Sequence, residues 1–317
     1  MSVDLEALKQ YMRVLVIKHG AFGDVILAQG AVQDIRESFP QAEIAVLTEP
    51  AFTKIWNRCP HVDQVLTDAR EPRWRLDLMW KLRQKLRAFD PDYVVDLQNS
   101  SRTALYRRKL LPNVEWSFIK DAKKAGSQFP KSMPSLERKF GQLKQSGLLH
   151  DHALAPDINW MANDVSVILA KAETKAPLIT LIPGCSAQHP HKRWPYYGEL
   201  AEALLSDGFE VVTVPGPDEL DLCAEIPGKM LTGEKFLNWF DLAGVLKASD
   251  FVVGNDTGPT HIASHLERPG LALFGPHASA ASTSITSRKL EAIEVAKLAE
   301  LEVETVLQAV RQRISVS

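Results

Sequence analysis

The chain has 317 residues, with a hydrophobic fraction of 45%, a charged fraction of 24% and a formal net charge of −2. These values are typical of a soluble globular protein long enough for two domains. The small net charge gives the chain no general attraction to nucleic acid, so we expect no nucleic-acid partner.

The amino terminus and the cysteines bear on localisation. The first ten residues lack a basic region followed by an apolar core, and no later run is apolar over the roughly 18 residues that a spanning helix needs. We therefore expect a cytoplasmic protein. Cys59, Cys185 and Cys223 are odd in number and far apart. This argues against a disulfide framework or a zinc knuckle.

The first elements read as the opening of a doubly wound parallel sheet. A buried strand is predicted at Arg13–Lys18 and a second at Ile44–Leu47. The residues between them show helical spacing and stop at Pro40. The apolar positions of that helix are Val25, Leu27, Ala28, Ala31, Val32 and Ile35.

The turn after the first strand contains Gly20-x-x-Gly23, which invites a dinucleotide-binding interpretation with Glu49 as the ribose acid. However, Lys18 stands where the leading glycine of that motif belongs, and Asp24 puts a carboxylate where a pyrophosphate would sit. Asp24 then has two interpretations. It either caps its helix or accepts a proton from a bound hydroxyl.

Basic residues accumulate in the next part of the chain. A helix is predicted over Trp74–Phe89, and its alternating apolar and basic stripes fit a helix packed on a sheet better than a membrane-surface helix. A strand follows at Tyr93–Leu97. In the helix after it, Arg102 and the basic run 107–109 either meet an anionic acceptor or form a solvated face, and the solvated face is preferred.

The middle of the chain reads as loops and a domain boundary. Residues 126–138 hold two prolines and few apolar residues, which predicts a long loop. The polar stretch 150–157 predicts the approach to a boundary, with a helix at Asn163–Ala172 beside it.

The second half repeats the plan of the first without repeating its sequence. Strands are predicted at Pro177–Pro183 and Glu210–Val214, with helices from Trp194 to about Leu205 and at Lys235–Lys247. Two such domains facing each other would form a cleft for a small ligand.

The stretch from Phe251 to Pro276 predicts two buried strands with a helix between them. Asn255 and Asp256 are residue types that cap helices, and Pro259 suits the first turn. Thr257 and Gly258 would then lie among the free N–H groups of the helix, which with its dipole favour an anion such as a diphosphate. The alternative is an ordinary crossover in which Asp256 only caps.

Three histidine pairs, 150/152, 189/191 and 261/265, are candidate metal ligands. No carboxylate accompanies the first two as an obvious ligand set, and the third lacks the glutamate of H-E-x-x-H. We therefore expect neither a metal nor another cofactor.

Five segments of the chain, in order, resemble the signatures of glycosyltransferase family 9, the ADP-heptose:lipopolysaccharide heptosyltransferases. They are R-V-L-V-I-K-H-G-A-F-G-D-V-I-L-A, F-D-P-D-Y-V-V-D-L-Q with Arg102 after it, P-G-C-S…K-R-W-P, V-P-G-P-D-E, and G-N-D-T-G-P-T-H-I-A…P-G-L-A-L-F-G-P. The resemblance spans residues from about 12 to about 276.

The resemblance implies a GT-B fold, in which two Rossmann-like, doubly wound parallel-sheet domains face each other across a cleft. Residues 1–160 would bind the acceptor and residues 161–317 the nucleotide sugar, with the last helix, Leu301–Ile314, packing back toward the N-terminal domain. Such enzymes invert the anomeric centre without a metal.

The same resemblance assigns roles to individual residues. Asp24 matches the proposed catalytic base and Lys192 a lysine on the donor phosphates that also assists catalysis. The remaining donor residues would be Ser186, Glu219, Asp256, Thr257, Gly258 and His261. Gly23 and Arg102 would contact the acceptor.

The implied partners are a nucleotide sugar, ADP-heptose first among them, and a saccharide or lipid-linked saccharide, with peripheral contact at the inner face of the inner membrane left open. The sequence departs from the family pattern after Pro276 and in the Q-H-P-H run before Lys192. The donor, the acceptor and the oligomeric state therefore stay open. A sugar-nucleotide epimerase and a non-catalytic nucleotide-sugar-binding protein are the alternatives.

Overall fold

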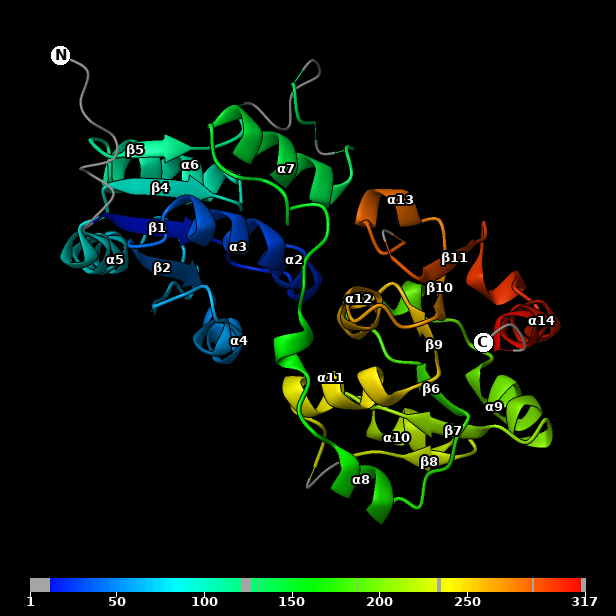
Figure 1. The fold of residues 1–317 in the computed structure, drawn as a ribbon. Helices are drawn as coiled ribbons and strands as arrows, with labels where there is room; N and C mark the ends of the chain where they lie inside the picture. Colours follow the sequence, from blue (N-terminus) through cyan, green and yellow to red (C-terminus); the bar gives the residue numbers. More distant parts are fainter. Residues whose placement is uncertain are drawn as a thin grey trace. The chain divides into compact units, whose positions relative to one another are not determined.

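The computed structural model describes residues 12–120, 127–130, 132–186, 188–232, 235–286 and 288–314 (Figure 1). The chain divides into two compact units, Met1–Pro156 and Asp157–Ser317, called here the first and second units. The sequence placed the division after residue 160.

The first unit contains a five-stranded sheet in the order β3-β2-β1-β4-β5. Every strand pair in it is parallel, as expected for a doubly wound fold. The strands are β1 Arg13–Ile17, β2 Glu43–Thr48, β3 Gln64–Thr67, β4 Tyr93–Asp96 and β5 Glu115–Ser117. Burial of both faces of β1 explains its unbroken apolar run.

The described helices of the first unit are α2 Phe22–Ile26, α3 Gln29–Ser38, α4 Thr53–Arg58, α5 Leu76–Phe89, α6 Ser101–Leu105 and α7 Ser135–Gln145. A π-helical turn, Tyr106–Leu110, extends α6, and a 3-10 turn, Pro50–Phe52, precedes α4. The apolar stripe of α5 is buried in the core under the sheet, as predicted.

Two predictions for the first unit need correction. The single helix expected before Pro40 is two helices, because the Val25 carbonyl accepts from the Ala28 N–H (3.2 Å) and from the Gln29 side-chain amide (3.1 Å). The loop expected over 126–138 ends earlier, because α7 begins at Ser135; of that stretch, residues 126 and 131 lie outside the described residues.

The second unit contains a six-stranded sheet in the order β11-β10-β9-β6-β7-β8, again with parallel pairs throughout. The strands are β6 Leu178–Ile182, β7 Glu210–Thr213, β8 Lys229–Met230, β9 Phe251–Asn255, β10 Gly270–Phe274 and β11 Leu290–Glu294. The predicted strands at 177–183, 210–214, 251–253 and 271–274 are confirmed.

The described helices of the second unit are α8 Ser166–Lys171, α9 Tyr197–Ser206, α10 Leu220–Ala224, α11 Trp239–Ala248, α12 Gly258–His265, α13 Ala280–Thr283 and α14 Val303–Ile314. Short 3-10 turns cover Asn159–Met161, Pro190–Lys192 and Leu298–Glu300. Among the described residues, no helix combines the length and the apolar character of a membrane span.

The helix expected at Lys235–Lys247 begins four residues later, at Trp239. The side chain of Asn238 caps it by accepting from the N–H groups of Phe240 (2.9 Å) and Asp241 (3.1 Å). The apolar side of α14 packs into the core of its own unit, beside α9. The predicted packing of this helix toward the N-terminal domain stays a prediction.

Both strand orders reverse direction at one point, between β1 and β4 in the first sheet and between β6 and β9 in the second. At such a point the loops leaving the two strands turn to opposite sides, which opens a crevice at the carboxyl ends of the strands. Candidate site residues should therefore be sought after β1 and β4, and after β6 and β9.

Candidate active site

A buried lysine and a partly exposed carboxylate meet after β1. Lys18 is 3% exposed, and its Nζ lies 3.3 Å from Asp24 Oδ2. The same ammonium donates to the Gly20 carbonyl (3.1 Å) and to Gln98 Oε1 (3.0 Å), which follows β4. Lys18, which stands where a dinucleotide-binding motif has its first glycine, is therefore the ionic partner of Asp24.

Asp24 lies in the first turn of α2, directly after Gly23, and its side chain keeps 41% of its exposure. Desolvation pushes its pKa upward, but the ammonium groups of Lys18 and Lys139 and the guanidinium of Arg138 outweigh this and hold the pKa below its ordinary value. No side-chain cap is made at the start of α2. The simple capping interpretation of Asp24 is therefore wrong, and the carboxylate is ionised and accessible.

Lys139 is the second ammonium near Asp24, and it comes from α7. Its side chain is buried, and Nζ donates to the Ser135 carbonyl (3.2 Å) and to Ser135 Oγ (2.7 Å). Burial, only partly offset by Asp24, lowers the Lys139 pKa to about 7. Two buried lysines, Lys18 and Lys139, thus flank the Asp24 carboxylate. When both lysines are protonated, these three groups together carry a net positive charge.

Arg102 lies on α6 after β4 and is mostly buried. Its guanidinium donates to Asp68 at 3.1 and 3.2 Å and to the Glu71 carbonyl at 2.7 Å. His19 Nε2 lies 3.0 Å from Asp68 Oδ2, and the Tyr106 hydroxyl also donates to this carboxylate. Although burial alone would raise it, these donors lower the pKa of Asp68.

The preferred solvated-face interpretation is therefore wrong for Arg102, which cross-links the chain after β3 to the chain after β4. A hollow of about 140 Å³ lies beside this cluster and is lined by Asp68, Lys81 and Arg102 among others. The predicted contacts of Gly23 and Arg102 with an acceptor stay predictions.

In the second unit, the loops after β6 and β9 bring Lys192 to Asp256. Lys192 Nζ donates to Asp256 Oδ2 at 2.6 Å, and His277 Nε2 lies 3.1 Å from the same oxygen. His261 Nε2 lies 3.9 Å from Asp256 Oδ1. Burial acts to raise the Asp256 pKa, but Lys192 and the two histidines hold it below its ordinary value.

The start of α12 differs from the prediction. Thr257 is the N-cap residue, with Gly258 and Pro259 opening the first turn. Asp256 does not cap, because its carboxylate is engaged by Lys192. The N–H groups in the first turn of this eight-residue helix are those that the sequence assigned to an anion.

Asn255 is not a cap either. It ends β9, and its amide donates to the carbonyls of Pro183 (3.0 Å) and Gly184 (3.1 Å), while Oδ1 accepts from the Trp194 N–H (3.0 Å). One buried amide thus fixes both ends of the loop that carries Lys192. The sequence located this residue but misassigned its partners.

Of the other predicted donor residues, Ser186 follows β6 and Glu219 follows β7. Glu219 accepts from the Gly216 N–H at 2.8 Å, and a Cβ at Gly184 would fall 2.0 Å from the Glu219 carboxylate. Burial raises the Glu219 pKa. Ser186 is exposed, and its carbonyl accepts from the His189 N–H at 2.8 Å. Beyond Glu219 an open hollow of about 600 Å³ is lined by Leu220, Met230 and Phe236 among others.

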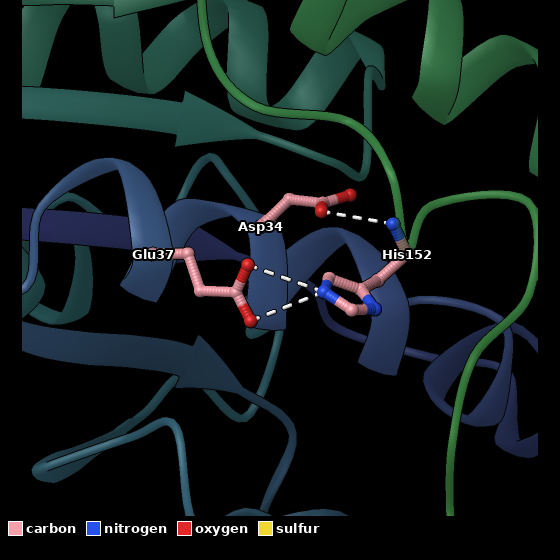
Figure 2. A group of neighbouring side chains, drawn as sticks. All are labelled: Asp34, Glu37 and His152. Atoms are coloured by element: carbon pink, nitrogen blue, oxygen red, sulfur yellow. Dashed lines mark hydrogen bonds and ion pairs between the residues drawn. The ribbon is translucent and has the colours of Figure 1, made fainter.

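Within the described part of the chain, one group of side chains has metal-ligand spacing: Asp34, Glu37 and His152 (Figure 2). Asp34 accepts from the His152 backbone N–H (2.9 Å), and Glu37 lies 3.1 Å from His152 Nε2. These bonds fasten the loop at His152 onto α3, so we assign the group a structural role. The predicted absence of a metal stays a prediction.

Comparison with known proteins identifies the family. The family model described as glycosyltransferase family 9 (heptosyltransferase) matches residues 79–309, more than two thirds of the chain. The chain belongs to glycosyltransferase family 9. This confirms the resemblance, and the enzyme class with it. The match begins after Asp24, so the role of that residue rests on the local geometry and the resemblance.

Individual relatives of this family 9 glycosyltransferase agree. Lipopolysaccharide heptosyltransferase 2 of Salmonella typhimurium is 27% identical over 295 residues, covering 84% of this chain and 83% of the relative. A family 9 structure from Veillonella parvula has a TM-score of 0.78 at 18% identity, covering 96% and 98% of the two chains. An E. coli heptosyltransferase with ADP-2-deoxy-2-fluoro heptose has a TM-score of 0.70 at 20% identity, covering 95% and 100%. These two structures show the GT-B fold.

Three residues of this glycosyltransferase were missed in the sequence. Lys139 is on a helix that was assigned to no element, although Leu136, Phe140 and Leu143 have helical spacing. Asp68 follows a short strand, β3, with only one buried residue. His277 is a single histidine in a plain loop, and no local signal places it beside Asp256.

Proposed function

We propose that this glycosyltransferase moves a heptose from ADP-heptose to a hydroxyl of a lipopolysaccharide-core saccharide, by direct displacement with inversion. The observation that carries the proposal is that each unit has the groups for one half of the reaction at the point where its strand order reverses. After β1 stands a carboxylate held ionised by buried lysines, and after β6 and β9 stand an ammonium and a helix N-terminus.

Asp24 acts as the base. As the acceptor oxygen attacks the anomeric carbon, Asp24 takes the hydroxyl proton, and the bond from that carbon to the ADP oxygen breaks with its electron pair leaving on ADP. A carboxylate with a lowered pKa is ionised at neutral pH, so it is ready to accept this proton without a prior deprotonation.

Lys192 and the first N–H groups of α12 receive the charge that develops on the departing diphosphate. Asp256 holds the ammonium of Lys192 at 2.6 Å from its carboxylate, so the ammonium is oriented before the donor binds. In the same proposal, Glu219 contacts the ribose side of the donor, and the hollow lined by Leu220, Met230 and Phe236 accommodates the nucleoside.

Two further features support the choice of donor and localisation. One structural neighbour holds an ADP-heptose analogue, and the curated relative carries out heptosyl transfer by its name. A lipopolysaccharide-core acceptor is lipid-linked, so we place the reaction in the cytoplasm with peripheral contact at the inner face of the inner membrane.

The test is the variant Asp24→Asn, which keeps the shape of the side chain and removes its basicity. We expect turnover to fall by about 10²–10⁴ while ADP-heptose binding, measured by calorimetry, stays unchanged. Normal turnover in this variant would show that Asp24 is not the base.

Two controls separate the alternatives. Wild-type enzyme incubated with donor alone should leave the sugar unchanged by mass analysis and NMR, whereas an epimerase would convert it. A protein that only binds nucleotide sugars would show no transfer to any acceptor. A chelator should leave transfer intact.

A further inference from the structure

Three large apolar side chains stand in solvent at the start of α5. Trp74, Leu76 and Trp80 are 76%, 77% and 59% exposed. Leu76 and Trp80 are four residues apart and so lie on one face of the helix, while its other face, with Met79, Leu82 and Leu86, is buried in the core of the first unit. The exposed residues are therefore not needed to fasten α5 to its sheet.

The same segment carries a strong positive charge. Residues 70–87 contain seven basic residues (Arg70, Arg73, Arg75, Lys81, Arg83, Lys85, Arg87) and two acidic ones (Glu71, Asp77), a net charge of +5. Since the whole chain has a net charge of −2, the remainder carries −7. Arg70 pairs with Glu49 and Arg75 with Asp77, whereas Arg73, Lys81, Lys85 and Arg87 are exposed and carry most of the charge that faces solvent.

We propose that the exposed surface formed by Arg73 and Trp74 before α5 and by Leu76, Trp80, Lys81 and Arg87 on it, called the Trp74–Arg87 face, docks the enzyme on an anionic lipid bilayer. Indole rings favour the headgroup layer of a membrane, where their apolar body and their N–H are both accommodated. Lysine and arginine beside them are attracted to anionic headgroups. A helix that lies in the interface combines these two features, as α5 does.

The position of the face suits a lipid-linked acceptor, and in this respect the proposal rests on the proposed function. The first turns of α5 border the hollow that Asp68, Lys81 and Arg102 line after β3 and β4. These residues belong to the unit that carries Asp24. A bilayer bound at the Trp74–Arg87 face would hold the lipid anchor of the acceptor on the unit that supplies the base.

The test is co-sedimentation of the full chain with vesicles of phosphatidylcholine alone or mixed with phosphatidylglycerol. We expect binding to the mixed vesicles that weakens as salt is added. The variant Trp74→Ser/Trp80→Ser should bind at least about tenfold more weakly, and Arg73→Gln/Lys81→Gln/Arg87→Gln should lose the preference for phosphatidylglycerol. Val167→Ser, at another exposed apolar position, and Lys54→Gln/Lys171→Gln/Lys247→Gln are matched controls that should bind like the wild type.

Failure of this proposal is distinct from failure of the proposed function. The Trp74→Ser/Trp80→Ser variant should transfer heptose normally to a water-soluble, delipidated acceptor. Absence of binding to either vesicle, or equal binding by the variants and their controls, would overturn the proposal. So would self-association of the wild type, seen by sedimentation velocity and lost in the tryptophan variant, because the face would then contact a second copy of the chain.

Discussion

Replacing Lys139 by methionine removes a buried ammonium while keeping a flexible side chain of similar length. Lys139 is 5% exposed, and its pKa lies at about 7 instead of its ordinary 10.5. At ~1.4 kcal/mol per pH unit, this difference corresponds to roughly 5 kcal/mol of native-state destabilisation. The methionine variant would also forgo the two bonds to Ser135, at about 1 kcal/mol each. We therefore expect Lys139→Met to raise the free energy of unfolding at pH 7 by about 2–4 kcal/mol.

The pH dependence follows from the sign of the shift. A lysine whose native pKa is lowered destabilises the fold fully below the native pKa of about 7, and the cost fades as the pH rises toward the unfolded value. Between pH 7 and 9 the cost should fall by roughly 2 kcal/mol. The advantage of Lys139→Met over the wild type should shrink by that amount.

The assay is urea unfolding followed by circular dichroism at pH 7 and pH 9, on the wild type, Lys139→Met and Lys144→Met. Lys144 is an exposed lysine on the same helix, so its replacement should change stability little and equally at both pH values. Turnover of Lys139→Met should fall, because Asp24 loses one of its two ammonium neighbours. An advantage that is the same at pH 7 and pH 9 would refute the reasoning.

Two further substitutions test the site and the fold. Lys192→Met should weaken ADP binding by about 10- to 100-fold in calorimetry, because a charged hydrogen bond to the diphosphate is lost; the exposed Lys171→Met is its control, and unchanged affinity would contradict the phosphate role. Gly30→Ala should lower the free energy of unfolding by about 1–3 kcal/mol, because its Cβ would meet the His152 carbonyl oxygen at 2.0 Å. Gly198→Ala, on α9 with open space around the new Cβ, should instead stabilise by up to about 1 kcal/mol; equal effects of the two would show that the close contact at Gly30 relaxes without cost.

Seven of the eleven described strands could be predicted, because parallel strands buried on both faces are continuous apolar runs, such as those of β1 and β9. The four edge strands, β3, β5, β8 and β11, are only partly buried and were not predicted. The residue types after the predicted strands point to Asp24 and to the start of α12 as candidate site residues, and both follow strands next to a point where the strand order reverses. What the sequence could not supply is pairing across the fold. Asn255 is a residue type that often caps helices, but its side-chain amide donates instead to the carbonyls of Pro183 and Gly184 in the loop after β6.

Charged residues show the same limit. In the sequence, Lys18 is notable only because it stands where a dinucleotide-binding motif has its first glycine. Lys139 has the pattern of a basic residue on an amphipathic helix, and only the fold shows that it is buried beside Asp24. The sequence predicts a solvated Arg102 because its partner, Asp68, is 34 residues away in the chain. Local patterns thus point to Asp24 and to the N-terminus of α12, whereas the groups of opposite charge that pair with the site residues come from distant elements.

The contacts of α3 with residues 149–152, just before the boundary between the two units, bear on the design of hybrid enzymes. Three successive turns of the helix hold this segment: Gly30 allows the His152 carbonyl to approach, Asp34 binds the His152 N–H, and Ser38 Oγ accepts from the Leu149 N–H at 2.9 Å. A chimera that exchanged the first unit between relatives with a junction upstream of Leu149 would separate these partners and leave the buried Asp34 carboxylate without the His152 N–H. Splicing after Pro156 keeps α3 and its own peptide segment together, so that junction should give folded hybrids.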